Sequence, residues 1–182
     1  FRSIAGKLPM LHFFDGFRTS HENQKIEIWD YDELKSMVDW DAVKRFRERS
    51  IHPTHPHSMG SAEQPETFFQ HREACNIVYD ETIEIVKEYM DKVNAKIGTN
   101  YKPFNYYGAK DATEVIIAMG SVCDAAEEVI DYLNAGGKKV GMVEVHLYRP
   151  FSIKYLLEVI PESVKRIAVL DRTKEPGSVG EP

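Results

Sequence analysis

The last third of the chain alternates short apolar runs with amphipathic segments, and this alternation limits the fold more than any other feature. Apolar runs at residues 115–119, 140–147 and 166–170 have the length and composition of buried strands. The segments between them, residues 122–134 and 152–160, have helical periodicity. Strands that alternate with helices form parallel sheets through right-handed crossovers. The sequence therefore predicts an α/β fold, a three-layer sandwich with a mainly parallel sheet.

A long amphipathic helix is predicted just before this region. Residues 76–97 carry apolar side chains at alternating spacings of four and three, which places them on one helical face. Gly98 follows at the position where a helix commonly ends on a left-handed glycine. The apolar positions are Tyr79, Ile83, Val86, Met90, Val93 and Ile97.

The first fifty residues predict shorter elements. Residues 8–14 form an apolar and aromatic run that favours a buried strand, and residues 25–29 alternate polar and apolar side chains as a second strand would. From Asp32 onward the pattern favours short surface helices, one of them capped by Asp39 or Asp41.

A long irregular stretch follows these helices. Pro53 and Pro56 exclude both a helix interior and a central strand at their positions. We therefore expect three parts: residues 1–50, a linker over residues 51–75, and an α/β domain with its leading helix over residues 76–182.

Charge and cysteine content exclude several classes of protein. The chain has 23 Lys and Arg against 29 Asp and Glu, a net charge of −6, so we expect no nucleic-acid partner. No apolar run approaches the roughly 20 residues needed to cross a membrane. The two cysteines, Cys75 and Cys123, stand apart in the sequence, which favours a reducing cytoplasm and excludes a four-ligand metal or iron–sulfur site within this chain.

Polar residues follow the ends of the three predicted strands. Because parallel strands end at one edge of a sheet, these residues are expected to form one polar rim. Such a rim could bind an anion, with Gly120 and Ser121 offering the N-terminus of a helix, or it could dock against another domain; we favour docking. Its members are Ser121, Arg149, Asp171, Arg172 and Lys174.

Other candidate residues are better explained as structural. His52, His55 and His57 lie in a proline-containing loop with no acidic or cysteine ligand beside them, so a solvated loop is favoured over a metal site. The adjacent residues 20–22 (Ser-His-Glu) do not make a catalytic triad, which needs a base oriented by a third group in space. His12 is expected to be a hydrogen-bonded core histidine, and both cysteines are expected to be small buried side chains.

Four longer segments stand in a fixed order: residues 12–22 (HFFDGFRTSHE), 69–76 (FQHREACN), 147–151 (LYRPF) and 170–177 (LDRTKEPG). Their order and spacing resemble those of the pyruvate:ferredoxin (or flavodoxin) oxidoreductase family, from about residue 9 to residue 182. The chain departs from the family pattern where His71 replaces a usual Gly, where Ile77 replaces a usual Pro, and where His146 replaces a frequent Arg. These departures bear on the substrate more than on the family.

The resemblance implies that the chain is an internal piece of a larger enzyme, as the start at Phe1 and the end in a turn sequence also suggest. Residues 1–50 would be the tail of a thiamine-diphosphate-binding domain, and residues 76–182 a domain similar to the C-terminal domain of transketolases. The parent would use thiamine diphosphate, Mg²⁺ and 4Fe–4S clusters to oxidise pyruvate with coenzyme A. Its partners would be the other domains of the parent chain, a second copy in a homodimer, and ferredoxin or flavodoxin.

The resemblance also implies that the substrate and cofactor contacts lie outside this segment. We therefore expect it to contain no catalytic, cofactor-binding or metal-binding residue, to be inactive alone, and to serve as a structural and docking part of the parent. Two alternatives stay open: a piece of another 2-oxoacid:acceptor oxidoreductase, and a stand-alone α/β interaction module.

Overall fold

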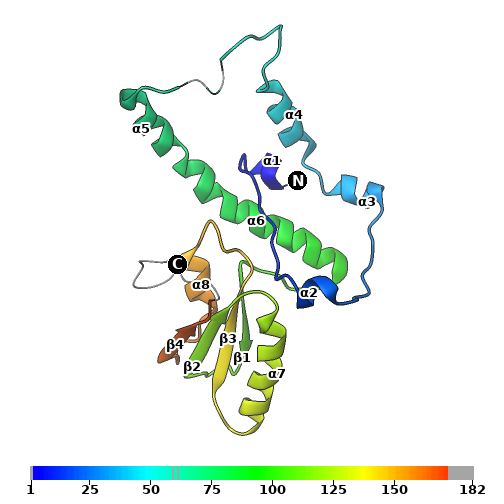
Figure 1. Cartoon of the computed structure of the whole chain (residues 1–182), viewed down its shortest axis with the longest axis vertical. Coiled ribbons are helices and arrows are strands. Elements are labelled where there is room, and N and C mark those ends of the chain that lie inside the picture. The colour runs from blue at the N-terminus through cyan, green and yellow to red at the C-terminus, as the bar shows by residue number, and fades with distance from the viewer. Residues whose placement is uncertain (1, 59, 61, 172–182) are drawn as a thin grey trace. The chain divides into compact units, whose positions relative to one another are not determined.

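The chain is described by a computed structural model over residues 2–58, 60 and 62–171 (Figure 1). It divides into two compact units. Unit 1 consists of Phe1–His12 and Gln24–Gly98, and unit 2 consists of Phe13–Asn23 and Thr99–Pro182.

Unit 2 is built on a four-stranded sheet. Its strands are β1 (Phe104–Gly108), β2 (Glu114–Ala118), β3 (Val140–Val145) and β4 (Arg166–Val169), in the order β1-β3-β2-β4. Strand β2 pairs in parallel with both β3 and β4, which confirms the three predicted parallel strands. Strand β1 pairs antiparallel with β3 and was not predicted.

Helices cover both faces of this sheet, so the predicted three-layer sandwich is confirmed. Met142 packs in a cluster with Cys123 and Ile130 of α7 (Val122–Ala135), whereas its neighbour Val143 packs in another cluster with Leu156 of α8 (Ile153–Val159). Successive side chains of a strand point to opposite faces, so α7 and α8 lie on opposite sides of β3.

A pair of glycines lets β1 and β3 approach at the end of their ladder. Gly108 has φ +121°, and a Cβ there would lie 2.6 Å from the Cα of Gly141. The hydroxyl of Tyr106 donates to the carbonyl of Ala109 at 2.5 Å and closes the turn that follows β1. Gly108 is therefore required by the close backbone of β3, and Gly141 is required because a Cβ there would clash with the Tyr106 ring.

Unit 1 is helical in the part that the structure describes. It contains α1 (Arg2–Ala5), α3 (Tyr31–Ser36), α4 (Trp40–Glu48), α5 (Pro65–Ala74) and α6 (Asn76–Ile97). The predicted long helix is confirmed as α6.

The caps of two helices in unit 1 lie at predicted positions. Gly98 is left-handed, with φ 72°, and its N–H donates to the carbonyl of Asn94 at 2.8 Å. At the start of α4, the carboxylate of Asp39 accepts from the N–H of Ala42 at 2.8 Å. Asp39, not Asp41, is therefore the N-cap.

Two predicted strands are wrong. Residues 8–14 and 25–29 form no strand, and their large apolar side chains are exposed, as in Leu11 at 89% and Ile28 at 85%. An apolar or alternating run becomes a strand only when another strand pairs with it, and neither segment has such a neighbour in the described part of the chain.

Helix α5 was also missed. It begins with Pro65 in the first turn, where proline is well tolerated. Its aromatic residues Phe68 and Phe69 are adjacent in sequence, so they form no apolar stripe at helical spacing that would have predicted the helix. The division into residues 1–50, 51–75 and 76–182 stays a prediction. No helix among the described residues combines the length and apolar character that a membrane span requires.

Candidate functional site

The carboxyl ends of β2 and β3 form the place where an open α/β sheet commonly binds a ligand. From β2 the chain continues into α7 on one face of the sheet, and from β3 it continues into α8 on the other face. Strands whose connections leave toward opposite faces mark a topological switch point. Gly120, with φ +80°, and Ser121 make the turn from β2 into α7 at this point.

A protein carboxylate fills the start of α7. Asp15 Oδ2 accepts a hydrogen bond from the N–H of Ser121 at 2.8 Å and another from its hydroxyl at 2.6 Å. The N–H group that could have bound an anionic ligand is thus used within the chain. No local signal in the sequence pointed to this contact, because 106 residues separate the partners.

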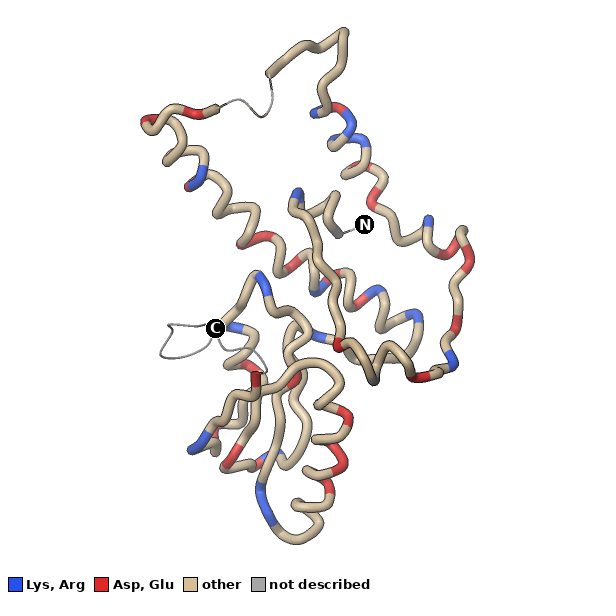
Figure 2. The backbone as a smooth tube through the Cα atoms, viewed as in Figure 1, with Lys and Arg blue, Asp and Glu red and all other residues tan. Residues whose placement is uncertain are grey.

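The surroundings of this turn are acidic. Burial, followed by the nearby Asp124, raises the pKa of Glu144, and burial together with Glu144 raises the pKa of Glu127. Both carboxyls therefore lie where negative charge is disfavoured. In Figure 2 the acidic positions along α7 stand out in red. A diphosphate group would meet this charge and would find the N–H of Ser121 already bonded to Asp15.

Cys123 lies in the same surroundings. Burial raises the pKa of its thiol to about 11, and Glu144 and Asp124 add to the shift. The thiol is therefore protonated near neutral pH, which suits the predicted role of a small buried side chain and not a nucleophile or metal ligand. In unit 1, Cys75 Sγ donates to the carbonyl of His71 at 3.3 Å.

The predicted polar rim is described only in part. Ser121 is bonded to Asp15, and the guanidinium of Arg149 lies 5.2 Å from the centre of the adjacent Tyr148 ring. Asp171 is exposed. Arg172 and Lys174 lie outside the described residues, so the complete rim stays a prediction.

The three loop histidines do not form a metal site. His52 Nδ1 lies 2.8 Å from the hydroxyl of Thr54, and His57 Nδ1 lies 3.1 Å from the carbonyl of His55. Within the described ranges, no group of three or more His, Cys, Asp or Glu side chains is arranged to hold a metal ion.

Ser20 and His21 are hydrogen-bonded but are not arranged for catalysis. Ser20 Oγ lies 3.1 Å from His21 Nδ1, and the same nitrogen lies 2.5 Å from the carbonyl of Phe17. A ring nitrogen that close to a carbonyl oxygen must carry the proton, so it cannot accept the proton of Ser20. His21 Nδ1 therefore does not act as a base toward Ser20 in this arrangement.

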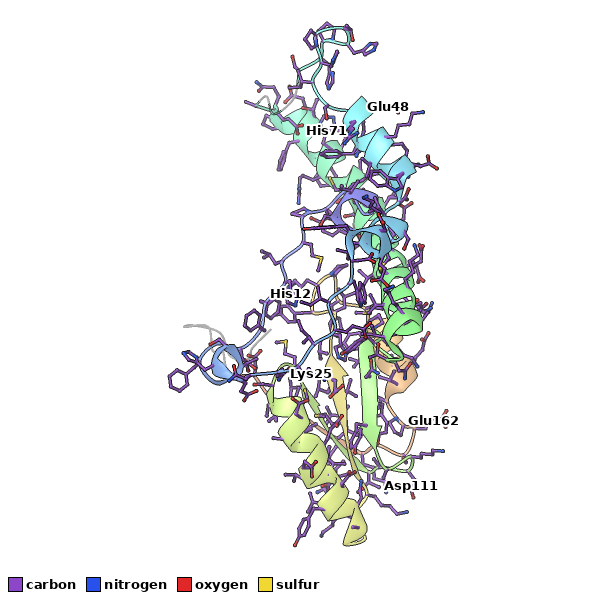
Figure 3. All side chains as sticks on the ribbon, turned by 90° about the vertical axis from the view of Figure 1, so that its right-hand side faces the viewer. His12, Lys25, Glu48, His71, Asp111 and Glu162 are labelled. Carbon is purple, nitrogen blue, oxygen red and sulfur yellow. The ribbon has the colours of Figure 1, made fainter. Side chains whose placement is uncertain are left out.

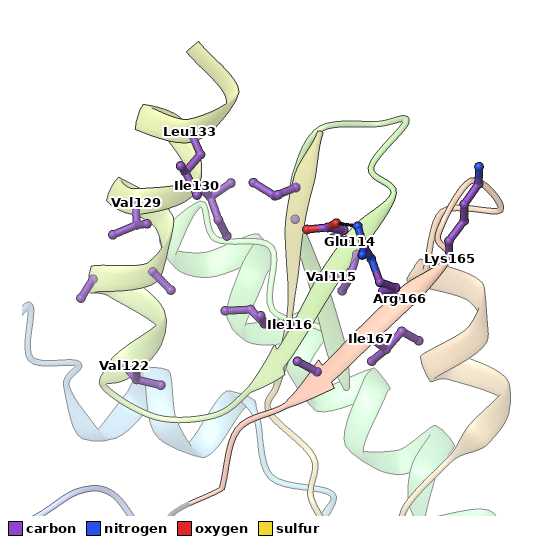
Figure 4. Close-up of a pocket in the computed structure, with 15 residues that line it drawn as sticks. Glu114, Val115, Ile116, Val122, Val129, Ile130, Leu133, Lys165, Arg166 and Ile167 are labelled. Carbon is purple, nitrogen blue, oxygen red and sulfur yellow. Dashed lines mark hydrogen bonds and ion pairs between the residues drawn. The ribbon is translucent and has the colours of Figure 1, made fainter. Parts of the chain in front are cut away.

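An apolar groove lies beside α7. Its volume is about 1040 Å³, and Figure 4 shows it between α7 and strands β2 and β4. Val122 is 45% exposed and Val129 is 55% exposed, although both are apolar. Sequence reasoning missed the groove, but a signal was present: Val122, Ala126, Val129 and Leu133 recur at spacings of four, three and four, and so form a stripe along α7.

The floor of the groove is polar at one end only. Arg166 and Glu114, opposite each other on β4 and β2, form an ion pair there (Figure 4). Ile116 and Ala168, the next pair facing the same side, continue the floor with apolar atoms.

The fold and these surfaces define an open α/β domain with a closed switch point and an uncovered apolar groove. Residues 3–91 match the family model described as pyruvate flavodoxin/ferredoxin oxidoreductase, thiamine-diphosphate-binding, and residues 112–181 match pyruvate:ferredoxin oxidoreductase core domain II. The chain belongs to the pyruvate:ferredoxin (flavodoxin) oxidoreductase family.

Individual relatives agree with this assignment. The chain is 57% identical to pyruvate-flavodoxin oxidoreductase of Enterobacter agglomerans and 52% identical to pyruvate:ferredoxin oxidoreductase of Moorella thermoacetica, in each case over 99% of this chain and 15% of the relative. It is 46% identical to the mitochondrial NADP⁺ pyruvate dehydrogenase of Euglena gracilis, over 99% of this chain and 10% of the relative. The chain thus spans about 15% of the length of the first two relatives.

A solved structure, the 2-oxoglutarate:ferredoxin oxidoreductase from Magnetococcus marinus with 2-oxoglutarate, coenzyme A and succinyl-CoA bound, aligns with 63% of this chain and 18% of its own. The identity is 19% and the TM-score is 0.39.

Proposed function

We propose that this chain is a structural and domain-docking segment of an enzyme that oxidises pyruvate. The parent reaction takes pyruvate and coenzyme A to acetyl-CoA, CO₂, a proton and two electrons, which ferredoxin or flavodoxin accepts. The observation that carries the proposal is sequence identity of 52–57% over 99% of the chain to relatives with this activity in their names.

Thiamine diphosphate, Mg²⁺ and 4Fe–4S clusters would be held by other parts of the parent. Thiamine diphosphate supplies the carbanion chemistry of such an enzyme when it is bound. Two observations in unit 2 support this: the N–H of Ser121 at the start of α7 is bonded to Asp15, and the Cys123 thiol resists ionisation. We accordingly assign no catalytic, cofactor-binding or metal-binding residue to this segment.

The docking role is supported by the exposed edge of the sheet in unit 2. All four residues of β4 are exposed, including Ile167 at 50% and Val169 at 65%. A parallel strand is normally buried on both faces, so β4 and the groove beside α7 need a cover. Because the relatives are several times longer than this chain, the cover we propose is the remainder of the parent polypeptide.

Charge placed in the groove tests this role in the full-length parent. Val129→Arg should lower the melting temperature or weaken assembly, because it puts a cation against the apolar cover, while the KM for pyruvate of the folded enzyme stays nearly unchanged. Tyr132→Arg is the matched control, since Tyr132 lies on α7, is 79% exposed and does not line the groove. Equal effects of the two variants would refute the docking role of the groove.

The polar rim allows a parallel test of the docking hypothesis drawn from the sequence. Charge reversal at Arg149 should weaken assembly or thermal stability without raising the KM for pyruvate or coenzyme A. A selective rise in either KM, with melting intact, would show that the rim binds ligand.

An activity comparison tests the proposal as a whole. The purified 182-residue chain should be colourless and inactive with thiamine diphosphate, Mg²⁺, coenzyme A and an electron acceptor, whereas the full-length parent should oxidise pyruvate. Ferredoxin, flavodoxin and NADP⁺ should be compared as acceptors, because the Euglena relative is named for NADP⁺. Turnover by the short chain, or preference of the parent for 2-oxoglutarate, would overturn the assignment.

We further propose a cytoplasmic location and a homodimeric parent. The location follows from the two separate cysteines, which favour a reducing compartment, and the homodimer follows from the family resemblance. Fractionation of cells and the mass of the parent in solution test them.

A further inference from the structure

One short segment belongs to a different unit from the residues on either side of it. Phe13–Asn23 groups with unit 2, whereas the chain before it and the chain from Gln24 to Gly98 belong to unit 1. In Figure 3 the labelled His12 and Lys25 mark the two ends of this segment. The segment lies in the match to the thiamine-diphosphate-binding region, while Ser121 lies in the match to core domain II.

Asp15 contacts the first turn of α7 from this segment. One oxygen of its carboxylate accepts from both the N–H and the hydroxyl of Ser121, at 2.8 and 2.6 Å. The Ser121 hydroxyl makes no capping bond to its own helix, although it stands at the N-cap position of α7. Asp15 thus supplies from a distant segment the acceptor for the N-cap N–H that the N3 side chain of a capping box provides in other helices.

Gly120 makes room for this carboxylate. A Cβ at Gly120 would lie 2.7 Å from Asp15 Oδ2, closer than the two atoms can approach. Gly120 also has φ +80°, which disfavours any other residue. Asp15, Gly120 and Ser121 therefore fit one another as a set.

The negative charges around Asp15, Gly120 and Ser121 favour a contact within the chain over a binding site for a free anion. Asp15, Asp124, Glu127 and Glu144 all act on Cys123 as nearby negative charges. A free anion would be repelled by these side chains, whereas Asp15 is brought to the turn by its own chain and is held by two directed hydrogen bonds.

We propose that Asp15, Gly120 and Ser121 form an interdomain latch. The Asp15 carboxylate fastens a loop of the thiamine-diphosphate-binding region onto the first turn of α7 in core domain II, and so fixes the position of the loop. This inference rests on the proposed function only for the names of the two regions, because the contact itself is independent of the reaction that the parent catalyses.

Hydrogen exchange in the full-length parent tests the latch. Asp15→Ala should make the amides of residues 13–23 and of the first turn of α7 exchange at least about tenfold faster, the factor that corresponds to losing one hydrogen bond to a charged group. The matched control is Asp131→Ala. Asp131 also lies in unit 2 and accepts a single hydrogen bond, from the Tyr107 hydroxyl at 2.8 Å, so its loss should leave residues 13–23 unchanged.

A double-mutant cycle separates the latch from a general loosening of unit 2. Ser121→Ala keeps the backbone N–H and loses the hydroxyl, so it should accelerate exchange in residues 13–23 less than Asp15→Ala does. The double variant should exchange no faster than Asp15→Ala alone, because both changes break the same contact.

Additive effects of the two substitutions, or unchanged exchange in residues 13–23 of Asp15→Ala, would overturn the latch. The readout is independent of turnover. A parent that prefers another 2-oxoacid would refute the proposed substrate and leave the latch standing, whereas the exchange results above would remove the latch and leave the substrate untouched.

Discussion

Unit 1 and unit 2 differ in how far they bury their own apolar residues. Among the described residues other than proline, the buried apolar side chains of unit 1 are Ala42 and Val86, whereas unit 2 holds ten. Both units expose large side chains, such as Phe69 at 69% in unit 1 and Phe17 at 84% in unit 2. Burial of apolar surface is the main source of stability, so the larger core of unit 2 stabilises it more than the small core of unit 1 stabilises unit 1.

The contrast concerns the size of the core, because both units leave apolar surface open: unit 1 at side chains such as Phe69, and unit 2 at β4 and in the groove beside α7. A region whose apolar surface stays open gains stability when another part of the protein covers it. Both tryptophans, Trp29 and Trp40, lie in unit 1, so tryptophan fluorescence follows unit 1, while the far-ultraviolet circular dichroism also includes the sheet of unit 2.

Truncation of a buried ring should separate the units most clearly. Phe104 is 1% exposed and packs edge-on to Phe151, with ring centres 5.6 Å apart. Phe104→Ala should cost unit 2 about 3–5 kcal/mol in the isolated chain, and Phe69→Ala, at an exposed site of unit 1, about 0.5 kcal/mol or less. Urea unfolding followed by circular dichroism measures both. Similar losses for the two variants would show that the units do not differ in packing.

Two glycines give the next comparison. Gly98 ends α6 in unit 1 with open space around its Cα, so Gly98→Ala should cost only the left-handed conformation, about 1 kcal/mol. Gly108→Ala in unit 2 adds a Cβ that would clash with Gly141, and should cost about 2 kcal/mol or more. Unfolding followed by tryptophan fluorescence and circular dichroism measures the two losses. A larger loss for Gly98→Ala than for Gly108→Ala would show that the close approach of β1 and β3 is not the reason for glycine at position 108.

The helix caps give a smaller difference in stability, and here the larger loss is expected in unit 1. The Asp39 carboxylate accepts from the N–H of Ala42 at 2.8 Å in unit 1, whereas the Ser152 hydroxyl accepts from the N–H of Tyr155 at 3.5 Å in unit 2. Asp39→Ala should therefore cost about 1 kcal/mol and Ser152→Ala less. Thermal unfolding of the two variants ranks them, and a larger loss for Ser152→Ala would contradict the geometry.

The last comparison concerns the sign of a pH effect. The hydrogen bond from Lys96, with that from the N–H of Asp30, lowers the pKa of Glu33 in unit 1, while burial and Asp124 raise the pKa of Glu144 in unit 2. Glu33 therefore contributes stability above its unfolded pKa and loses it as the pH falls through the folded value. The ionised Glu144 opposes folding at neutral pH, and this opposition disappears as the pH falls below its unfolded pKa.

Glutamine variants measure these two signs. At about pH 7, Glu33→Gln should be less stable than the unmodified chain, and Glu144→Gln more stable. Both differences should shrink toward zero as the pH falls below the pKa of ordinary carboxyl groups, about 4.3 for Glu. Denaturant unfolding between neutral and acidic pH provides the measurement, and a destabilised Glu144→Gln at neutral pH would contradict the assigned shift.

Prediction from the sequence succeeded where a local pattern alone decides the element. The apolar spacing of α6 and its final Gly98 correspond to one helix and its cap. Strands β2 and β3 are largely apolar on both faces, as parallel strands between helices must be, and the apolar run of β4 also forms a strand although it is exposed. Residues 8–14 carry an equally apolar run and form no strand, because pairing with another segment, and not composition, makes a strand.

By itself the sequence determined the family, the α/β class and the helix-to-strand order of the last third, because these depend on residue identity and on periodicity along the chain. Only the tertiary structure decided that β1 joins the sheet antiparallel, that a groove stays open beside α7, and that Asp15 bonds to Ser121. Each of these is a meeting of segments distant in sequence, and the spacing of residues along one segment carries no information about which remote partner will contact it.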